Sequence, residues 1–188
     1  MILEGLKDYR NPKMKLGRLV AEGKYTPVIR GLYETDPKTP GHLISSFYSP
    51  SYLSFEYALS RYGLIPEGVR AYTLATYGKH KSKEYDTPFG MFYCYDVPRR
   101  AFGTGVNAVR EGDYVYWMAT PEKALCDKLY DLKPIESKRY VENLILDDLR
   151  IDEGGLDEMD CALIETLSEL YRCKNVSLFC DYMKGRGL

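Results

Sequence analysis

Near the start of the chain, hydrophobic residues recur with helical spacing. Leu16, Leu19 and Val20 fall at positions i, i+3 and i+4, so one face of a helix would carry all three. Lys15 and Arg18 lie on another face of the same helix. The pattern predicts a short amphipathic helix whose polar side is basic.

The residues around this segment also indicate a helix. Asn11 is a suitable N-cap, Pro12 suits the first helical turn, and Gly23 can take the left-handed conformation that ends a helix. The next residues, YTPVIRGLYET, are typical of two short strands around a turn near Arg30 and Gly31. A helix followed at once by a hairpin is the closing half of a winged helix-turn-helix, in which the helix enters the major groove of DNA and the hairpin touches the backbone.

The middle of the chain favours strands. Apolar and β-favouring residues run without helical period through VRAYTLATYG, FGMFYCYDV and DYVYWMAT, and the glycine-rich RRAFGTGVNAVREG separates the last two. KHKSKEYDTP indicates a loop or a strand edge. Two helices are expected before these strands, in HLISSFY and in SPSYLSFEYALSRYGLIPEG, the latter with Ser51 as its cap and Gly63 as its stop.

The rear of the chain favours helices. TPEKALCDKLYDL has Thr120 as a candidate N-cap and Pro121 at the first helical position. Three further amphipathic segments follow, ESKRYVENLILDDLRI, LDEMDCALIETLSELYRC and NVSLFCDYMKGR. A strand-rich middle and a helical rear predict an α+β fold rather than repeating βαβ units. The inward face of the first of these helices is expected to comprise Ala124, Leu125, Lys128 and Leu129.

Two domains are expected. Residues 1–36 would form an abbreviated winged-helix unit, a helix plus a hairpin, packed on a mixed α/β domain over residues 37–188 whose last part is helical and acidic. Charge divides the chain similarly: residues 1–34 hold seven Lys or Arg against four Asp or Glu, whereas residues 135–170 hold three against eleven. The two ends should therefore offer surfaces of opposite charge.

The overall composition is that of an ordinary globular protein, with 45% hydrophobic and 28% charged residues and a net charge of −1. No apolar run approaches the roughly 18–20 residues of a membrane span. The start, MILEGLKDYR, lacks a signal-peptide core, so we expect a cytoplasmic protein. Five cysteines without a CxxC pair, and two histidines, offer few zinc ligands, and we expect no metal or cofactor.

The search for catalytic motifs is mostly negative. The sequence lacks GxSxG, a P-loop, HExxH and a GxGxxG that follows a strand. Asp157 and Asp160 have the i, i+3 spacing at which carboxylates converge, but acids in a first helical turn are favoured by the helix dipole alone. A PD-(D/E)xK nuclease needs an acid-x-lysine on a strand, whereas PEK at residues 121–123 opens a helix. We therefore expect a protein without enzymatic activity and keep such a nuclease as the less favoured alternative.

Basic residues give the stronger signal. One stretch of 18 residues, within the predicted helix and hairpin, contains five basic residues: Lys13, Lys15, Arg18, Lys24 and Arg30. DNA-binding proteins neutralise phosphates with such clusters, and each contact makes the affinity fall with salt. A solvated helix face would have the same sequence pattern, so charge alone leaves both interpretations open. The segment KHKSK at residues 79–83 is a weaker basic patch with the same ambiguity.

Several motifs occur in an order that points to one family. DYRNPKMKLGRLVAEGKYTPVIRGLYET combines a lysine-bearing helix, LxxLVxxGK, with a hairpin that ends in RGLY. SPSYLSFEYALSRYGLIPE, TPFGMFYCYDV and MATPEKALCDKLYDL follow, and the last, with PEKAL leading into a helix, is the most specific. Over roughly residues 8–132 the chain resembles the AbiEi family, the antitoxins of a type IV toxin–antitoxin system associated with abortive phage infection.

This resemblance implies an antitoxin that also binds the promoter of its own operon as a transcriptional regulator. It implies a functional partner, a nucleotidyltransferase-like toxin, which can be opposed without a tight complex between the two proteins. Carried over residue by residue, it places Lys13, Lys15 and Arg18 at phosphates or base edges, and Lys24 and Arg30 on the wing, with Thr26 as a neighbouring hydrogen-bonding group.

The front of the chain departs from the complete motif. Only about ten residues precede Asn11, too few for the two helices that come before a recognition helix. The unit is expected either to be abbreviated and packed on the larger domain or to have lost its first helices. A homodimer that presents two units to a two-fold operator would compensate. The alternative function is an antitoxin or protein-interaction module without DNA binding, which the acidic rear of the chain would suit.

Overall fold

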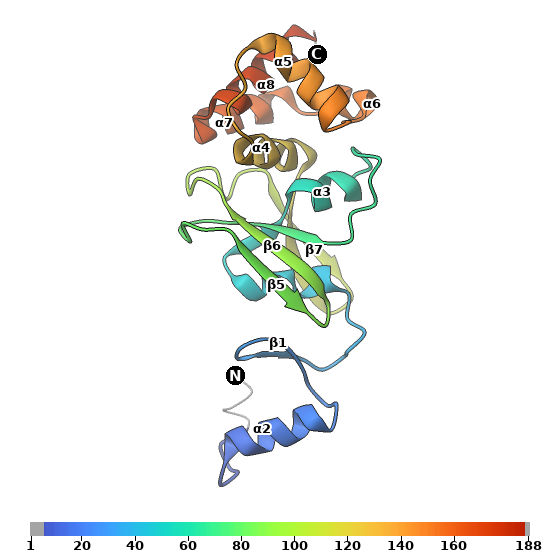
Figure 1. Ribbon diagram of the computed structural model, residues 1–188, viewed down its shortest axis with the longest axis vertical. Coiled ribbons are helices and arrows are strands. Elements are labelled where there is room, and N and C mark those ends of the chain that lie inside the picture. Colours follow the sequence, from blue (N-terminus) through green and yellow to red (C-terminus); the bar gives the residue numbers. More distant parts are fainter. Residues whose placement is uncertain (1–5, 187–188) are drawn as a thin grey trace.

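A six-stranded mixed β-sheet forms the middle of the molecule (Figure 1). The structure is a computed structural model that describes residues 6–186, apart from the side chain of Lys138. The strand order is β5-β6-β4-β3-β8-β7. The strands are β3 (Ser51–Leu53), β4 (Tyr72–Thr76), β5 (Lys83–Thr87), β6 (Gly90–Asp96), β7 (Val106–Glu111) and β8 (Tyr114–Ala119).

The short strand β3 lies at the centre of this sheet. It pairs antiparallel with β4 and parallel with β8. All of its residues are buried, which is typical of a strand covered on both faces. Further out, β6 runs parallel to β4, while β5 and β7 form the two edges in antiparallel pairs with β6 and β8. The sheet therefore mixes parallel pairs near its centre with antiparallel pairs toward its edges.

Helices cover one end of the sheet. Helices α3 (Phe55–Arg61) and α4 (Pro121–Asp131) pack on each other, and α4 also packs against two helices of the C-terminal layer, α7 and α8 (Figure 1). Because α4 lies between the sheet and this layer, most of its residues are buried. The C-terminal elements are α5 (Lys138–Asn143), the π-helix η2 (Leu144–Asp148), α6 (Glu153–Asp157), α7 (Cys161–Tyr171) and α8 (Lys174–Gly185).

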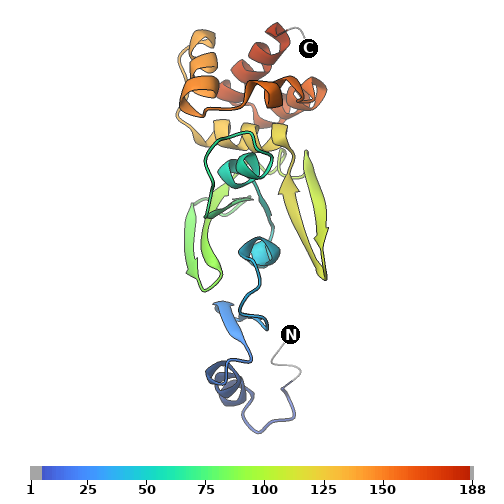
Figure 2. The ribbon, with the colours of Figure 1, turned by 90° about the vertical axis from the view of Figure 1, so that its right-hand side faces the viewer.

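The N-terminal unit projects from the opposite end of the sheet (Figure 2). It consists of helix α2 (Pro12–Ala21) and a hairpin of two antiparallel strands, β1 (Thr26–Ile29) and β2 (Leu32–Glu34). The 3-10 helix η1 (Gly41–Tyr48) follows and packs on β3 and β8. The hairpin and η1 together line a cavity of about 240 Å³. The hairpin thus lies against the body of the protein, and α2 lies beyond it at the far end of the molecule.

The expected α+β fold is confirmed, with a hairpin at the front, strands in the middle and helices at the rear. The expected helix with Ser51 as its cap is wrong in its first part, because residues 51–53 form β3 and α3 begins only at Phe55. Pairing with two neighbouring strands decides the conformation of these three residues, and a local pattern does not contain that information.

Two further expectations were incomplete. The glycine-rich segment between β6 and β8 contains strand β7, whose residues are mostly half-buried or exposed because it is an edge strand. The segment LDEMDCALIETLSELYRC is not one helix: α6 ends at Asp157, and Asp160 starts α7 as its N-cap, accepting hydrogen bonds from two backbone N–H groups. Asp157 and Asp160 therefore do not share a first helical turn.

The expected first domain, residues 1–36, starts with five residues that lie outside the described part of the chain. Within residues 6–186, no helix has both the length and the apolar character needed to cross a membrane.

Candidate nucleic-acid interface

Helix α2 begins and ends at the residues that its sequence indicates. The side chain of Asn11 accepts a hydrogen bond from the backbone N–H of Met14 at 3.1 Å, and Pro12 occupies the first helical position. At the other end, the N–H of Gly23 bonds to the carbonyl of Val20, and the N–H of Lys24 bonds to that of Leu19. These two bonds, with Gly23 at a φ of 71°, form a Schellman motif.

The hairpin begins at Thr26, after four residues that follow the end of α2. Its turn is formed by Arg30 and Gly31, as expected, and Gly31 has a φ of 90°, a conformation that other residues rarely adopt. Lys24 lies in the short connection before β1 rather than on a strand. Thr26 is the first residue of β1, half-buried and paired with Glu34. The local signals of caps and turn glycines are thus sufficient to define this whole unit.

One face of α2 is exposed and narrow. Leu16 and Leu19 are buried, and the opposite side carries the small residues Gly17 and Ala21 together with Met14, which is 57% exposed. A Cβ built at Gly17 would meet no atom within 4 Å, so no side chain among residues 6–186 covers the helix at this position. At Gly17 and Ala21 the helix can approach another surface closely, as a helix in the major groove must, and Met14 beside them offers an apolar contact.

Basic side chains flank this exposed face. Lys13 and Arg18 are both exposed, and at 100° per residue they lie on opposite borders of the Gly17–Ala21 side. Arg30 is exposed at the tip of the hairpin. Lys15 is half-buried instead, with its ammonium 5.1 Å from the centre of the Tyr9 ring. The expected basic face therefore runs from Lys13 to Arg18, with Lys15 to one side.

A carboxylate lies within this basic group. Glu22 pairs with Lys24 at 3.0 Å, with both side chains well exposed. The hydrogen bond from Lys24 lowers the pKa of Glu22 most, and the positive charges of Lys24, Lys15 and Arg18 lower it further. Glu22 is therefore ionised at neutral pH and would compete with a phosphate for the same cations.

The basic unit and the acidic helices lie at opposite ends of the molecule (Figure 1). The acidic residues of 135–170 belong to α5, η2, α6 and α7 and to the loops beside them, in the layer beyond α4. The sheet separates that layer from α2 and the hairpin. The chain's own acidic helices therefore do not neutralise the basic residues of the N-terminal unit.

A second group of polar residues, which the sequence analysis missed, lies in the core. Lys123 and Asp127 are separated by one helical turn of α4, and both side chains are completely buried, with Lys123 Nζ 3.3 Å from Asp127 Oδ1. Lys123 also donates hydrogen bonds to the carbonyl oxygen of Ala101 at 2.8 Å and to the hydroxyl of Tyr171. Lys128, which was expected to point inward, is only half-buried and pairs with Glu56.

Three hydroxyl groups also donate hydrogen bonds to the carboxylate of Asp127. Ser54 Oγ donates to it at 2.6 Å, the Tyr52 hydroxyl at 3.0 Å, and the Tyr171 hydroxyl donates as well. Tyr52 belongs to β3, Ser54 precedes α3 and Tyr171 ends α7, so the network joins the sheet, α4 and the C-terminal layer. Burial raises the pKa of the Tyr52 and Tyr171 hydroxyls well above their usual value, and the Asp127 charge raises it further.

The same network accounts for the Pro-Glu-Lys motif. Pro121 starts α4, and Glu122 accepts a hydrogen bond from the backbone N–H of Asp160 at 3.0 Å, which holds the start of α7. Burial lowers the pKa of Lys123, an effect that the nearby Asp127 charge opposes. Each residue of the motif thus has a structural contact, and Lys123 has no exposed surface through which a substrate could reach it.

No cluster that could hold a metal ion is found in the part of the chain that the structure describes. A group of three or more His, Cys, Asp or Glu side chains in ligand geometry does not occur among these residues. The two carboxylates considered as a converging pair have other roles: Asp160 caps α7, and Asp157 pairs with Arg186.

Comparison with known proteins adds no family: no protein-family model matches the chain, and no curated protein matches it either. The resemblance to AbiEi proteins therefore remains a hypothesis that rests on the order of the motifs in the sequence.

The buried hydroxyl and thiol groups predict a loss of stability in alkali. Burial raises the pKa of Cys94 from 9.0 to about 12 and, with smaller contributions from neighbouring tyrosines, that of Tyr57 from 10.0 to about 12. The unfolded chain would release these protons at lower pH than the folded chain. Their contribution to stability is thus complete below about pH 9 and is lost as the pH rises toward 12. Lys123 acts in the opposite direction because its pKa is lowered.

We expect the urea midpoint to be constant from pH 7 to 8.5 and to fall steadily above pH 9. A Cys94→Ala variant should show a shallower fall, by up to about 1.4 kcal/mol per pH unit between pH 9 and 12. An unchanged urea midpoint up to pH 11 would contradict this prediction, because it would mean that these groups have the same pKa in the folded and the unfolded chain.

Proposed function

We propose that this protein binds duplex DNA through α2 and the hairpin, and that it acts as an autoregulatory antitoxin of the AbiEi type. The observation that carries the first part is the exposed face of α2, with Gly17, Ala21 and the exposed Met14 between Lys13 and Arg18 on its borders, and with Arg30 at the nearby hairpin tip. The second part rests on the resemblance in the order of motifs. No enzymatic activity is proposed.

In the proposed complex, α2 lies in the major groove and the hairpin tip contacts the backbone. Lys13 and Arg18 reach the phosphates on the two sides of the groove, because they lie on opposite borders of the exposed face. Arg30 and Lys24 contact phosphates from the hairpin and its connection. Thr26 is half-buried in β1, so we assign it at most one hydrogen bond to the sugar–phosphate backbone of the DNA. A partner toxin resembling a nucleotidyltransferase is opposed without a requirement for a stable complex.

The acidic end of the molecule favours a second candidate function. The layer formed by α5 to α7 carries a large excess of acidic residues, many of them exposed, together with the exposed ring of Tyr140. Such a surface suits a basic protein partner. An antitoxin that acts through this end alone, without DNA binding, is the alternative to the first proposal.

Equilibrium binding to duplex DNA across a salt series separates the two. The probes are the DNA upstream of the protein's own gene and a scrambled duplex of equal length, each titrated by fluorescence anisotropy between about 50 and 200 mM salt. We expect tighter binding to the upstream duplex and a log–log salt slope no steeper than about −3.6 for the four cationic contacts per monomer, or about twice that for a dimer. A slope near zero, or equal weak binding to both duplexes, would favour the second candidate.

Removing the carboxylate at the interface should strengthen binding. Glu22→Gln removes the negative charge that faces Lys15, Arg18 and Lys24, so we expect about two- to fivefold tighter binding to duplex DNA. Glu158→Gln makes the same change in net charge at the acidic end and should have a smaller effect. Weaker or unchanged binding in the Glu22 variant would place the DNA elsewhere on the protein.

A further inference from the structure

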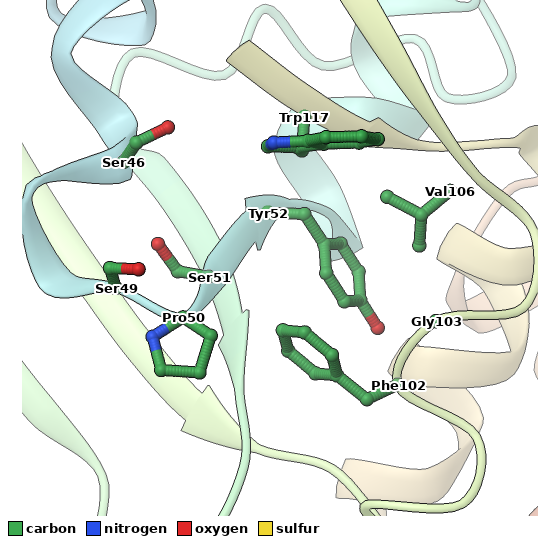
Figure 3. A pocket seen from close by; sticks show the side chains of 9 residues that line it. All are labelled: Ser46, Ser49, Pro50, Ser51, Tyr52, Phe102, Gly103, Val106 and Trp117. Carbon is green, nitrogen blue, oxygen red and sulfur yellow. The ribbon is translucent and has the colours of Figure 1, made fainter.

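A cavity of about 310 Å³ opens beside the centre of the sheet (Figure 3). Three aromatic side chains line it: Tyr52 of β3, Phe102 of the loop between β6 and β7, and Trp117 of β8. Trp117 is 48% exposed, so its ring is accessible to a ligand. This volume is at the lower end of the range for small-molecule sites, which limits the ligand to a small one.

The walls of this aromatic pocket are held in place by contacts behind them. The Tyr52 hydroxyl is bonded to the buried Asp127, and the Phe102 ring packs on Tyr52 at 4.9 Å and on Tyr77 at 4.6 Å between ring centres. The Tyr52 and Phe102 side of the pocket is therefore already ordered, which limits the conformational entropy lost there on binding. Tyr52 is only 2% exposed, so the ring surface open to a ligand belongs mainly to Trp117 and Phe102.

The opposite side of the pocket is polar but uncharged. Ser46 of η1 and Ser49 of the turn into β3 are both exposed, and their side chains lie on the side away from the Phe102 ring (Figure 3). Hydroxyl groups can donate to or accept from the edge of a heterocyclic ring. None of the residues that line the pocket is charged, so the part of a ligand inside it should be neutral.

A cation contacts one of the residues that line the pocket. Lys79 Nζ is 3.4 Å from the carbonyl oxygen of Ser49 and 4.8 Å from the centre of the Tyr48 ring. Lys83 lies over the same ring at 4.9 Å, and Lys81 is exposed between them in the sequence. Lys79 of the segment KHKSK thus contacts the backbone of one lining residue, Ser49, so a positive charge lies beside the uncharged, ring-lined interior.

We propose that this pocket binds a nucleotide, with the base against Trp117 and the phosphate toward Lys79. A flat neutral heterocycle fits the aromatic walls, the serine hydroxyls face its edge, and the anionic group matches the lysines outside. The nucleotide can be free or part of a single strand, since both present the same base and phosphate. This site is separate from the proposed duplex-binding face of α2.

The chain offers a direct probe, because Trp117 is its only tryptophan. A base that stacks on the indole should quench its fluorescence in a saturable way. The ligands to titrate are AMP, adenosine, inorganic phosphate and an oligodeoxyadenylate strand of about eight nucleotides, with a free tryptophan amide as the control for absorption by the ligand.

We expect saturable quenching by AMP, about fivefold weaker affinity for adenosine, and no quenching by phosphate alone. Lys79→Ala should reduce the affinity for AMP to that for adenosine and leave the affinity for adenosine unchanged. Lys133→Ala, which removes an exposed lysine in the loop after α4, should change neither affinity. Tighter binding of AMP than of the strand identifies a free nucleotide as the ligand, and the reverse order identifies a single strand.

Two results would overturn the proposal: no saturable quenching by AMP or by the strand, or equal affinities for AMP and adenosine that Lys79→Ala does not change. The duplex-binding proposal is tested independently, because a Lys13→Ala/Arg18→Ala variant should keep the AMP response in full even if it no longer binds duplex DNA.

Discussion

Lys123→Met is expected to lower the free energy of unfolding by about 3–5 kcal/mol, the usual cost of removing one partner of a buried ion pair. In the folded protein Asp127 would remain completely buried without a countercharge. The hydroxyls of Tyr52, Ser54 and Tyr171 would still donate to it, but they carry no charge. Urea denaturation at pH 7, followed by circular dichroism, measures this loss.

Lys128→Met in the same helix is the matched control. Lys128 pairs with Glu56, but both side chains are partly exposed, so the expected loss is at most about 1 kcal/mol. A Lys123→Met/Asp127→Asn double variant should be more stable than the sum of the two single variants predicts, because it leaves no unpaired charge in the core. If the Lys123 and Lys128 variants lost the same free energy of unfolding, burial of the Lys123–Asp127 pair would not add to the cost of removing the lysine.

Lys13→Ala/Arg18→Ala is expected to weaken binding to every duplex and to flatten the log–log salt slope by about two units. Each side chain is assigned one phosphate, so the loss should be the same for the upstream and the scrambled duplex. Both residues are exposed, so the variant should unfold at the same urea concentration as the wild type. Anisotropy titrations across the salt series give both the affinity and the slope.

A Lys133→Ala/Arg139→Ala variant provides the control, since it removes the same two residue types from exposed positions near the acidic end. It should leave the slope unchanged. Lys15→Ala should have less effect than either residue of the double variant, because Lys15 is half-buried beside Tyr9. If the two double variants lose affinity equally, net charge and not the α2 face governs DNA binding.

Elements with strong local signals were predicted well from the sequence. Asn11 and Gly23 delimit α2, Gly31 permits the hairpin turn, and Thr120 caps α4, whose N-terminus it was expected to mark. In each case the hydrogen bonds involved join residues within a few positions of one another. The prediction of such elements requires no knowledge of the rest of the fold.

Elements defined by distant partners were predicted poorly. Residues 51–53 became a strand because β4 and β8, which begin about 20 and 60 residues later, pair with them. The sequence pattern does not predict that Lys123 is buried, because a lysine in an amphipathic helix is usually exposed. Its burial depends on Ala101 and Tyr171, which lie 22 and 48 residues away.

The sequence by itself determined the α+β order of elements and the helix and hairpin at the front, because caps, turn glycines and hydrophobic period act over a few residues. Only the tertiary structure decided which basic residues of α2 are exposed, that the acidic helices lie at the other end, and that Lys123 and Asp127 form a buried pair. It alone also brought Trp117, Phe102 and Tyr52 around one pocket. The physical reason is the same throughout: exposure, charge separation and buried pairing depend on contacts between segments far apart in the chain, and local patterns do not specify those contacts.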